Sequence, residues 1–144
     1  MNSKIKLIIF DLDGVLVEAK DIHYKSLNKA LGKTYAISWN EHLSIYDGLK
    51  TNQKLDMLSN NKNLPTSDHK QIWNKKQKYT LQFLSELKSS KQLQSTMSKL
   101  VEDGYKIVVC SNSIRKTVLT VLSKLGIMEY MDLIVSNEDV KNSK

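Results

Sequence analysis

Two acidic residues at the end of an apolar run are the part of this sequence best suited to chemistry. Residues 7–10 read Leu-Ile-Ile-Phe and lead directly into Asp11 and Asp13, which Gly14 follows. A short apolar run that meets polar residues and a glycine predicts a buried strand. Unpaired carboxylates cannot stay inside such a strand, so we expect Asp11 and Asp13 at its carboxyl end, where open α/β sheets bind ligands.

The spacing of the two acids indicates what they could do. Residues two apart on an extended chain point the same way, and Gly14 lets the chain turn sharply away. Converging carboxylates of Asp11 and Asp13 could hold a hard cation such as Mg²⁺, or divide the duties of nucleophile and acid/base. The alternative is a surface turn, because Asp-Gly is a common turn pair.

A second candidate site follows another apolar run, residues 107–110. There Ser111-Asn112-Ser113 stands just before a helical pattern. A hydroxyl, free backbone N–H groups and the positive end of a helix dipole together bind phosphate. Taken alone, Ser111 or Ser113 is more simply a helix N-cap, and the acids upstream favour the phosphate site.

Three short apolar runs must position these residues. They cover residues 7–10, 107–110 and 133–135, and helical patterns separate them. This order predicts an α/β fold with a parallel sheet and right-handed crossovers. No strand pattern interrupts residues 17–88, which we expect to be a helical insertion.

Within the insertion, apolar spacing predicts helices near residues 22–31, 38–46, 51–58 and 67–87. Gly32 should end the first of these helices. Trp39, Leu43 and Ile45 are the apolar residues of the second, and Thr51 can cap the third.

Composition bounds the function classes. The 144 residues suit one domain, or a small core with a small insertion. A net charge of +7 favours anionic ligands. The lysines are scattered without interleaved aromatics, so nucleic acid is not the expected partner, although a salt-dependent gel shift would test that alternative. A single cysteine, Cys110, and the lack of a visible signal or membrane segment indicate a cytoplasmic protein without a membrane partner.

The run Asp11-Leu-Asp13-Gly14 behind a hydrophobic strand resembles the first motif of the haloacid dehalogenase superfamily. Members of this superfamily are phosphate-transfer enzymes with a Rossmann-like core. The resemblance implies that Asp11 is the nucleophile and forms an aspartyl-phosphate. It also implies that Asp13 is the general acid/base, and that Mg²⁺ bridges Asp11 to the phosphate.

Two further stretches resemble motifs of the same superfamily. Cys-Ser-Asn-Ser resembles the second motif, which implies that Ser111 holds a phosphoryl oxygen and that Asn112 adds contacts. Residues 135–144 resemble the segment that leads to the third motif, a lysine that offsets the charge of nucleophile and phosphate. Lys144 matches the family's spacing better than the competing Lys141.

The helical insertion resembles the cap of the family's first subgroup, the relatives of β-phosphoglucomutase and phosphoglycolate phosphatase. This implies a core formed by residues 1–16 and 89–144, with residues 17–88 as the cap. His23 matches a histidine that faces the active site at the cap hinge, and its alternative is an ordinary exposed helix residue. The stretch around Gly48, Lys50 and Lys54 resembles the substrate-facing loop of the cap.

The resemblance also implies parts that this sequence does not contain. The family's fourth motif, a pair of acids after a fourth strand, would lie beyond residue 144, and the family's strand order is 5-4-1-2-3. The first strand would then have a bare outer edge, which invites pairing with another chain. We therefore expect a shortened chain, a fragmentary gene product or a form completed by a partner, with self-association through that edge.

The function implied is that of a Mg²⁺-dependent phosphohydrolase. It would act on a small phosphorylated metabolite through an aspartyl-phosphate. One alternative is a phosphomutase of the β-phosphoglucomutase type. Another is a catalytically incomplete fragment that acts as a binding or regulatory protein.

Overall fold

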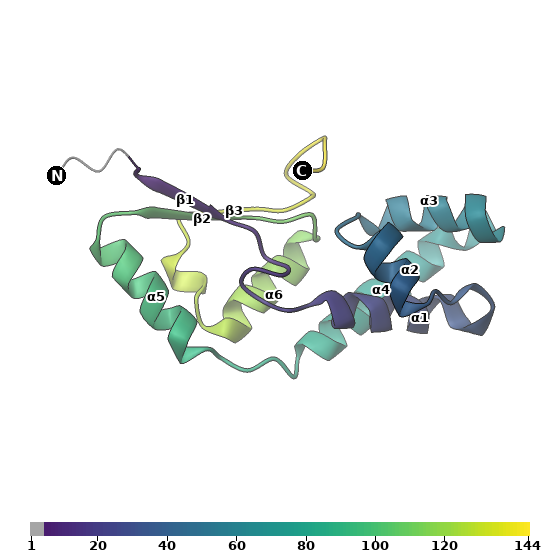
Figure 1. The fold of residues 1–144 in the computed structure, drawn as a ribbon, viewed down its shortest axis with the longest axis horizontal. Helices are drawn as coiled ribbons and strands as arrows, with labels where there is room; N and C mark the ends of the chain where they lie inside the picture. The colour runs from purple at the N-terminus through teal and green to yellow at the C-terminus, as the bar shows by residue number, and fades with distance from the viewer. Residues whose placement is uncertain (1–4) are drawn as a thin grey trace. The chain divides into compact units, whose positions relative to one another are not determined.

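The computed structural model describes residues 5–144 and divides into two compact units (Figure 1). Among the described residues, the sheet unit consists of residues 5–18 and 85–144, and the helical unit consists of residues 19–84. The predicted α/β class with a parallel sheet is confirmed, and so is the helical insertion, because the helical unit contains helices and no strand.

In the described residues, the sheet unit contains a parallel sheet in the order β1-β2-β3. Its strands are β1 (Leu7–Phe10), β2 (Lys106–Cys110) and β3 (Leu133–Val135). The connecting segments are α5 (Lys91–Glu102), α6 (Arg115–Leu125) and a 3-10 turn, η3 (Met128–Tyr130). Ile8 pairs with Ile107, and Val109 pairs with Ile134, so the three carboxyl ends come together at one edge of the sheet.

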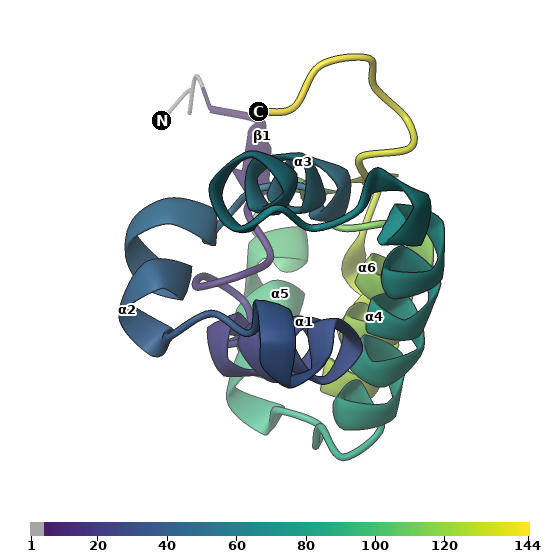
Figure 2. The same ribbon diagram turned by 90° about the vertical axis from the view of Figure 1, so that its right-hand side faces the viewer.

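Both helices of the sheet unit lie on the same face of the sheet (Figures 1 and 2). Ile107 and Val109 are fully buried on that face. On the other face Leu7 and Ile9 are 48% and 61% exposed. The prediction that residues 7–10 form a buried strand is therefore wrong. Side chains alternate across a strand, and even on the covered face Ile8 and Phe10 are only partly buried. In the described chain β1 is an edge strand, and self-association through it stays a prediction.

The helical unit is built around two long helices, α1 and α4, which pack against each other. Its segments are α1 (Lys20–Tyr35), α2 (Trp39–Glu41), the π-helical turn η1 (His42–Tyr46), α3 (Thr51–Lys62), the 3-10 turn η2 (Thr66–Asp68) and α4 (His69–Leu84). Leu27, Leu55, Leu58 and Ile72 lie in its core. Gly32 interrupts α1 with a φ of 72°, as its predicted role as a helix stop requires, although α1 resumes beyond it. No helix among residues 5–144 is long and apolar enough to cross a membrane.

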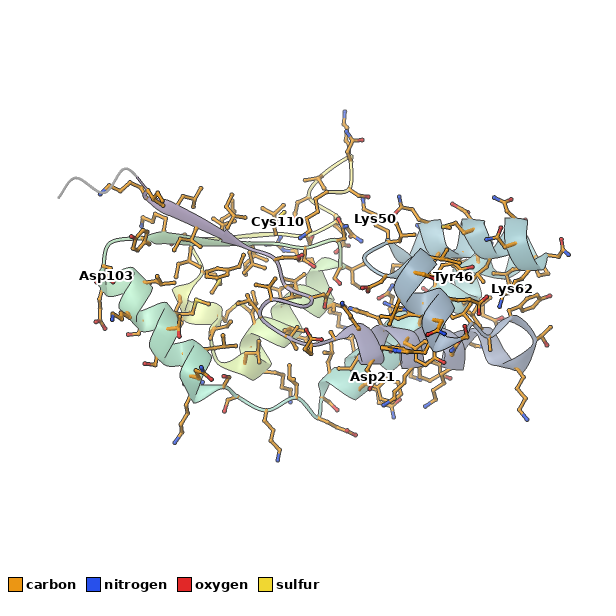
Figure 3. All side chains as sticks on the ribbon, in the orientation of Figure 1. Asp21, Tyr46, Lys50, Lys62, Asp103 and Cys110 are labelled. Atoms are coloured by element: carbon orange, nitrogen blue, oxygen red, sulfur yellow. The ribbon has the colours of Figure 1, made fainter. Side chains whose placement is uncertain are left out.

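Two details of the predicted helices are wrong. Leu43 and Ile45 are exposed, whereas His42 and Tyr46, four residues apart, occupy the buried face of that segment (Figure 3 labels Tyr46). A search for apolar side chains alone does not find a face that contains a histidine. Thr51 does not cap α3 but is its first residue, because the backbone N–H of Lys50 donates to Gln53 Oε1 at 3.0 Å and so makes Lys50 the N-cap.

His42 is an unusual core residue because it is fully buried and stacks on Trp39, with ring centroids 5.4 Å apart. Neither of its ring nitrogens makes a regular hydrogen bond in the described part of the chain. Burial lowers the pKa of His42, the positive charge of Lys54 acts in the same direction, and Asp47 opposes both. The folded protein therefore holds this imidazole in its neutral form.

This geometry predicts acid sensitivity of the helical unit. The unfolded chain has the ordinary histidine pKa of 6.5, so as the pH falls through that value it binds a proton that the folded chain does not. The free energy of unfolding then falls with falling pH, and continues to fall until the lower folded pKa is passed. In His42→Phe, which keeps an aromatic ring against Trp39, the melting temperature should fall less between neutral and mildly acid pH.

Thermal unfolding of both proteins over that pH range measures the difference. His69→Gln is the matched control, because His69 contacts Ser59 and Asp56 near the surface of the same unit. An equal pH dependence in the wild type and His42→Phe would contradict the assignment.

Candidate functional site

The carboxyl ends of the parallel strands define the edge at which the candidate residues gather. Figure 3 shows Cys110, the last residue of β2, at this edge and Asp103 near the opposite end of the strand. Asp11 follows β1 directly, and Ser111 follows β2. Ligands of open α/β sheets bind at such an edge.

Asp11 has one carboxylate oxygen held and the other open. Its Oδ1 accepts the backbone N–H of Leu12 at 2.7 Å and pairs with Nζ of Lys144 at 2.5 Å. Its Oδ2 has no hydrogen-bond partner among residues 5–144, and the side chain is about half exposed. The two donors fix the orientation of the carboxylate and leave Oδ2 available to a ligand.

The turn after Asp11 presents Asp13 to the loop that follows β2. Gly14 has a φ of 78° and donates its N–H to Val17 O at 2.8 Å, so a tight turn closes around the fully buried Leu12. Asp13 Oδ2 accepts a long hydrogen bond, 3.4 Å, from Ser113 Oγ. The structure thus connects the acidic motif to the serine motif.

Ser111 is nearly buried, and its Oγ accepts the backbone N–H of Ser113 at 3.1 Å. The alternative interpretation of Ser111 or Ser113 as the cap of α6 is wrong, since Ile114 holds the N-cap position without a side-chain hydrogen bond. The first N–H of the helix, that of Arg115, donates instead to Glu138 Oε2 at 2.6 Å. The loop after β3 therefore caps α6, and the hydroxyl groups of Ser111 and Ser113 are not used to cap this helix.

Lys144 reaches the same place from the far end of the described chain. Besides Asp11, its Nζ donates to Cys110 O at 2.7 Å. The side-chain Oδ1 of Asn112 accepts the backbone N–H of Lys144 at 3.2 Å. Lys141 makes no hydrogen bond or ion pair in the described part of the chain. The geometry favours Lys144 over Lys141 as the lysine beside Asp11.

The oxygen donors at this edge of the sheet, those of Asp11 and Asp13, can be compared with the ligands that metal ions prefer. No group of three or more His, Cys, Asp or Glu side chains is arranged to hold a metal ion among residues 5–144. Mg²⁺, however, keeps several waters and binds through one or two carboxylates. Asp11, with an open Oδ2, and Asp13 in the adjoining turn supply oxygen donors of the type that a hydrated Mg²⁺ accepts.

Other predicted residues, His23, Gly48, Lys50 and Lys54, belong to the helical unit. Lys54 is only 5% exposed, and His23 Nδ1 lies 3.4 Å from Nζ of Lys76, which is 6% exposed. Gly48 occupies a turn with a φ of 74°, and Lys50 precedes α3 (Figure 3). Burial of two lysines in one small helical unit is uncommon, because a desolvated ammonium is costly.

Sequence reasoning missed Lys76 and His42. Lys76 follows Ile72 by four residues and precedes Thr80 and Leu84 at the same spacing, and all four are buried on one face of α4. That i, i+4 pattern was the available signal. No such periodic signal marks His42, because its apolar neighbours in the sequence, Leu43 and Ile45, are exposed.

The sequence model of one protein family, described as haloacid dehalogenase-like hydrolase, matches residues 8–144. No curated protein matches the chain.

Solved structures share its fold. A predicted phosphoglycolate phosphatase from Haemophilus somnus 129PT has a TM-score of 0.83 at 21% identity, over all of this chain and 68% of that one. A β-phosphoglucomutase from Clostridium difficile has a TM-score of 0.82 at 26% identity, over 97% of this chain and 65% of that one. CbbY from Rhodobacter sphaeroides, in complex with xylulose-(1,5)bisphosphate, has a TM-score of 0.81 at 18% identity, over 97% and 67%. The chain thus spans about two thirds of the length of these structures.

The turn at Gly14 generates a stability prediction. Gly14→Ala places a Cβ in a left-handed conformation and should lower the free energy of unfolding by about 1–2 kcal/mol. Urea unfolding measures the loss, and Val15→Ala, at the exposed neighbouring position, is the control. Equal stability of Gly14→Ala and Val15→Ala would show that the turn does not need the positive φ.

Proposed function

Since this chain belongs to the haloacid dehalogenase-like hydrolase family, we propose that it is a Mg²⁺-dependent phosphohydrolase acting on a small phosphorylated metabolite. The observation that carries the proposal is the state of Asp11. One oxygen is held by Leu12 and Lys144, and the other is open at the carboxyl edge of the sheet. A fixed carboxylate with one available oxygen is what a nucleophile at this position requires.

In the first proposed step the phosphate lies against the Ser111 hydroxyl and the ammonium of Lys144, which balance its charge. Oδ2 of Asp11 attacks phosphorus in line. The bond from phosphorus to the substrate oxygen breaks, and Asp13 gives its proton to that leaving oxygen. Mg²⁺, held by the Asp11 carboxylate and by an uncharged oxygen of Asp13, would supply positive charge that reduces the repulsion between phosphate and carboxylate.

In the second proposed step Asp13, now ionised, takes a proton from water. The water oxygen attacks phosphorus, which releases inorganic phosphate and restores the Asp11 carboxylate. The ordering of Asp13 by Ser113 supports one residue performing both proton transfers.

A phosphomutase is the second candidate, and the 26% identity with a β-phosphoglucomutase favours it. A second hydroxyl of the substrate would then replace water. A binding protein without turnover is the third candidate, and the lack of a third acidic ligand group in residues 5–144 favours that one.

We assign substrate selection to the helical unit, as a cap. Lys54 and Lys76 place positive charge in its interior, with His23 beside Lys76, which suits an anionic substrate. One structure of the same fold holds a bisphosphate, and a phosphate ester with a further anionic group is the class we propose here. The single cysteine, Cys110, supports the predicted cytoplasmic location.

Hydrolysis of p-nitrophenyl phosphate tests the activity. We expect turnover with Mg²⁺ and none with excess chelator. Asp11→Asn should reduce the rate to background, because the amide is not a nucleophile, and Asp13→Asn should lower kcat by about 10²–10⁴-fold. Asp103→Asn is the matched control, since Asp103 lies near the opposite end of β2 and should leave kcat unchanged (Figure 3).

Turnover that persists in Asp11→Asn would contradict the aspartyl-phosphate mechanism. Absence of turnover in a folded wild type would favour the binding protein. Transfer of phosphate to a second hydroxyl of a sugar phosphate, without release of inorganic phosphate, would favour the mutase.

A separate prediction concerns Lys76. Lys76→Met removes a buried positive charge, so KM for a bisphosphate should increase more than KM for a monophosphate. Lys75→Met, at the exposed neighbouring position, is the control for both KM values. A KM that is unchanged for both substrates would remove Lys76 from substrate selection.

A further inference from the structure

We propose that Asp139 and Arg115 are positioning residues for Lys144, which they hold beside Asp11 through the segment 136–144, called here the strap. The catalytic part of this inference rests on the proposed function, whereas its structural part does not. Neither residue contacts Asp11 among the described interactions.

The strap begins in a turn that Asp139 closes. Its Oδ2 accepts both the backbone N–H and the hydroxyl of Ser136, each at 2.7 Å. The backbone N–H of Asp139 donates to Ser136 O at 3.2 Å, and Ser136 is fully buried. A single carboxylate therefore fixes the direction in which the chain leaves β3.

Arg115 fastens that turn to the first turn of α6. Its Nη1 donates to Asp139 Oδ2 at 3.0 Å, to Asp139 Oδ1 at 3.3 Å and to Ile134 O at 3.3 Å. The hydrogen bonds from the backbone and hydroxyl of Ser136 lower the pKa of Asp139, and Arg115 acts in the same direction. The carboxylate is thus ionised at neutral pH, when all of these donors can bind it.

Further contacts fix the start of the strap to the loop after β2. The backbone N–H of Asn137 donates to Ser113 O at 3.1 Å, and its side chain donates to Asn112 O at 2.9 Å. Glu138 accepts the N–H of Arg115. Asn112 in turn binds the backbone of Lys144, so the two ends of the strap share one anchoring loop.

Between these two ends the described residues of the strap have no further polar anchor. Residues 140–143 make no hydrogen bond or ion pair in the part of the chain that the structure describes. Lys144 therefore reaches Asp11 across a short free segment that starts at the Asp139 anchor. Release of that anchor lengthens the free segment and raises the entropy cost of holding Lys144 against Asp11.

The first test does not need activity. Limiting acylation with an N-hydroxysuccinimide ester of acetic acid, followed by peptide mass spectrometry, measures the reactivity of each lysine. In Asp139→Asn the labelling rate of Lys144 should rise about two- to fivefold, as for release of an exposed ion pair, while that of Lys141 stays unchanged.

Asp132→Asn is the matched control. Asp132 accepts the backbone N–H of Ile107 at 2.8 Å and pairs with Lys106 at 3.0 Å, near the amino end of β2, and these contacts lower its pKa as well. It should leave the labelling of Lys144 unchanged. Arg115→Gln is a second variant in case Asp139→Asn does not fold, and Arg115→Lys should retain part of the protection. An unchanged labelling rate of Lys144 in the folded strap variants would overturn the inference.

The second test separates positioning from plain stability. Asp139→Asn should lower kcat for p-nitrophenyl phosphate in the wild type but not further in Lys144→Ala, because the two changes act through one side chain. Equal losses in both backgrounds would overturn the positioning role. If the wild type has no turnover while Lys144 labelling responds to Asp139→Asn, the proposed function fails and the strap stands.

Discussion

The ion pair between Asp11 and Lys144 joins the first strand of the sheet unit to the far end of the described chain. A carboxylate at the end of a strand needs a donor for one oxygen if the other is to face a ligand in a fixed direction. Leu12 supplies a local donor, and Lys144 supplies a charged one from the opposite end of the described chain. The parallel sheet makes this possible because it brings the ends of β1 and β2 to one edge.

The helical unit contains buried side chains of lysine and histidine. It buries Lys54, Lys76 and His42, which belong to residue types that are seldom fully buried. Burial lowers the pKa of His42, so at neutral pH this ring adds no full positive charge to that of Lys54.

The sequence predicted the parts of this structure that depend on short-range patterns. Apolar runs located β1 and β2, and the acids directly after β1 indicated the candidate site. The exposure and the hydrogen-bond partners of a residue were harder to predict where they depend on elements that are distant in the sequence. The exposure of Ile9 follows from which face the helices cover, and the capping of α6 by Glu138 depends on a residue far along the chain. Neither the exposure of Ile9 nor the capping of α6 produces a periodic pattern in the nearby sequence.

Arg115 is a residue whose type reflects such a long-range contact. It is the one arginine in a sequence that otherwise uses lysine for its positive charges. Its guanidinium binds both oxygens of Asp139 and the carbonyl of Ile134, which places donors toward two separate groups at once. All three hydrogen bonds come from Nη1, whose N–H bonds lie in the fixed plane of the guanidinium, whereas a lysine ammonium is a compact charge that rotates on a flexible stem. Where three elements must be joined at a fixed angle, the choice of arginine follows from geometry rather than from charge.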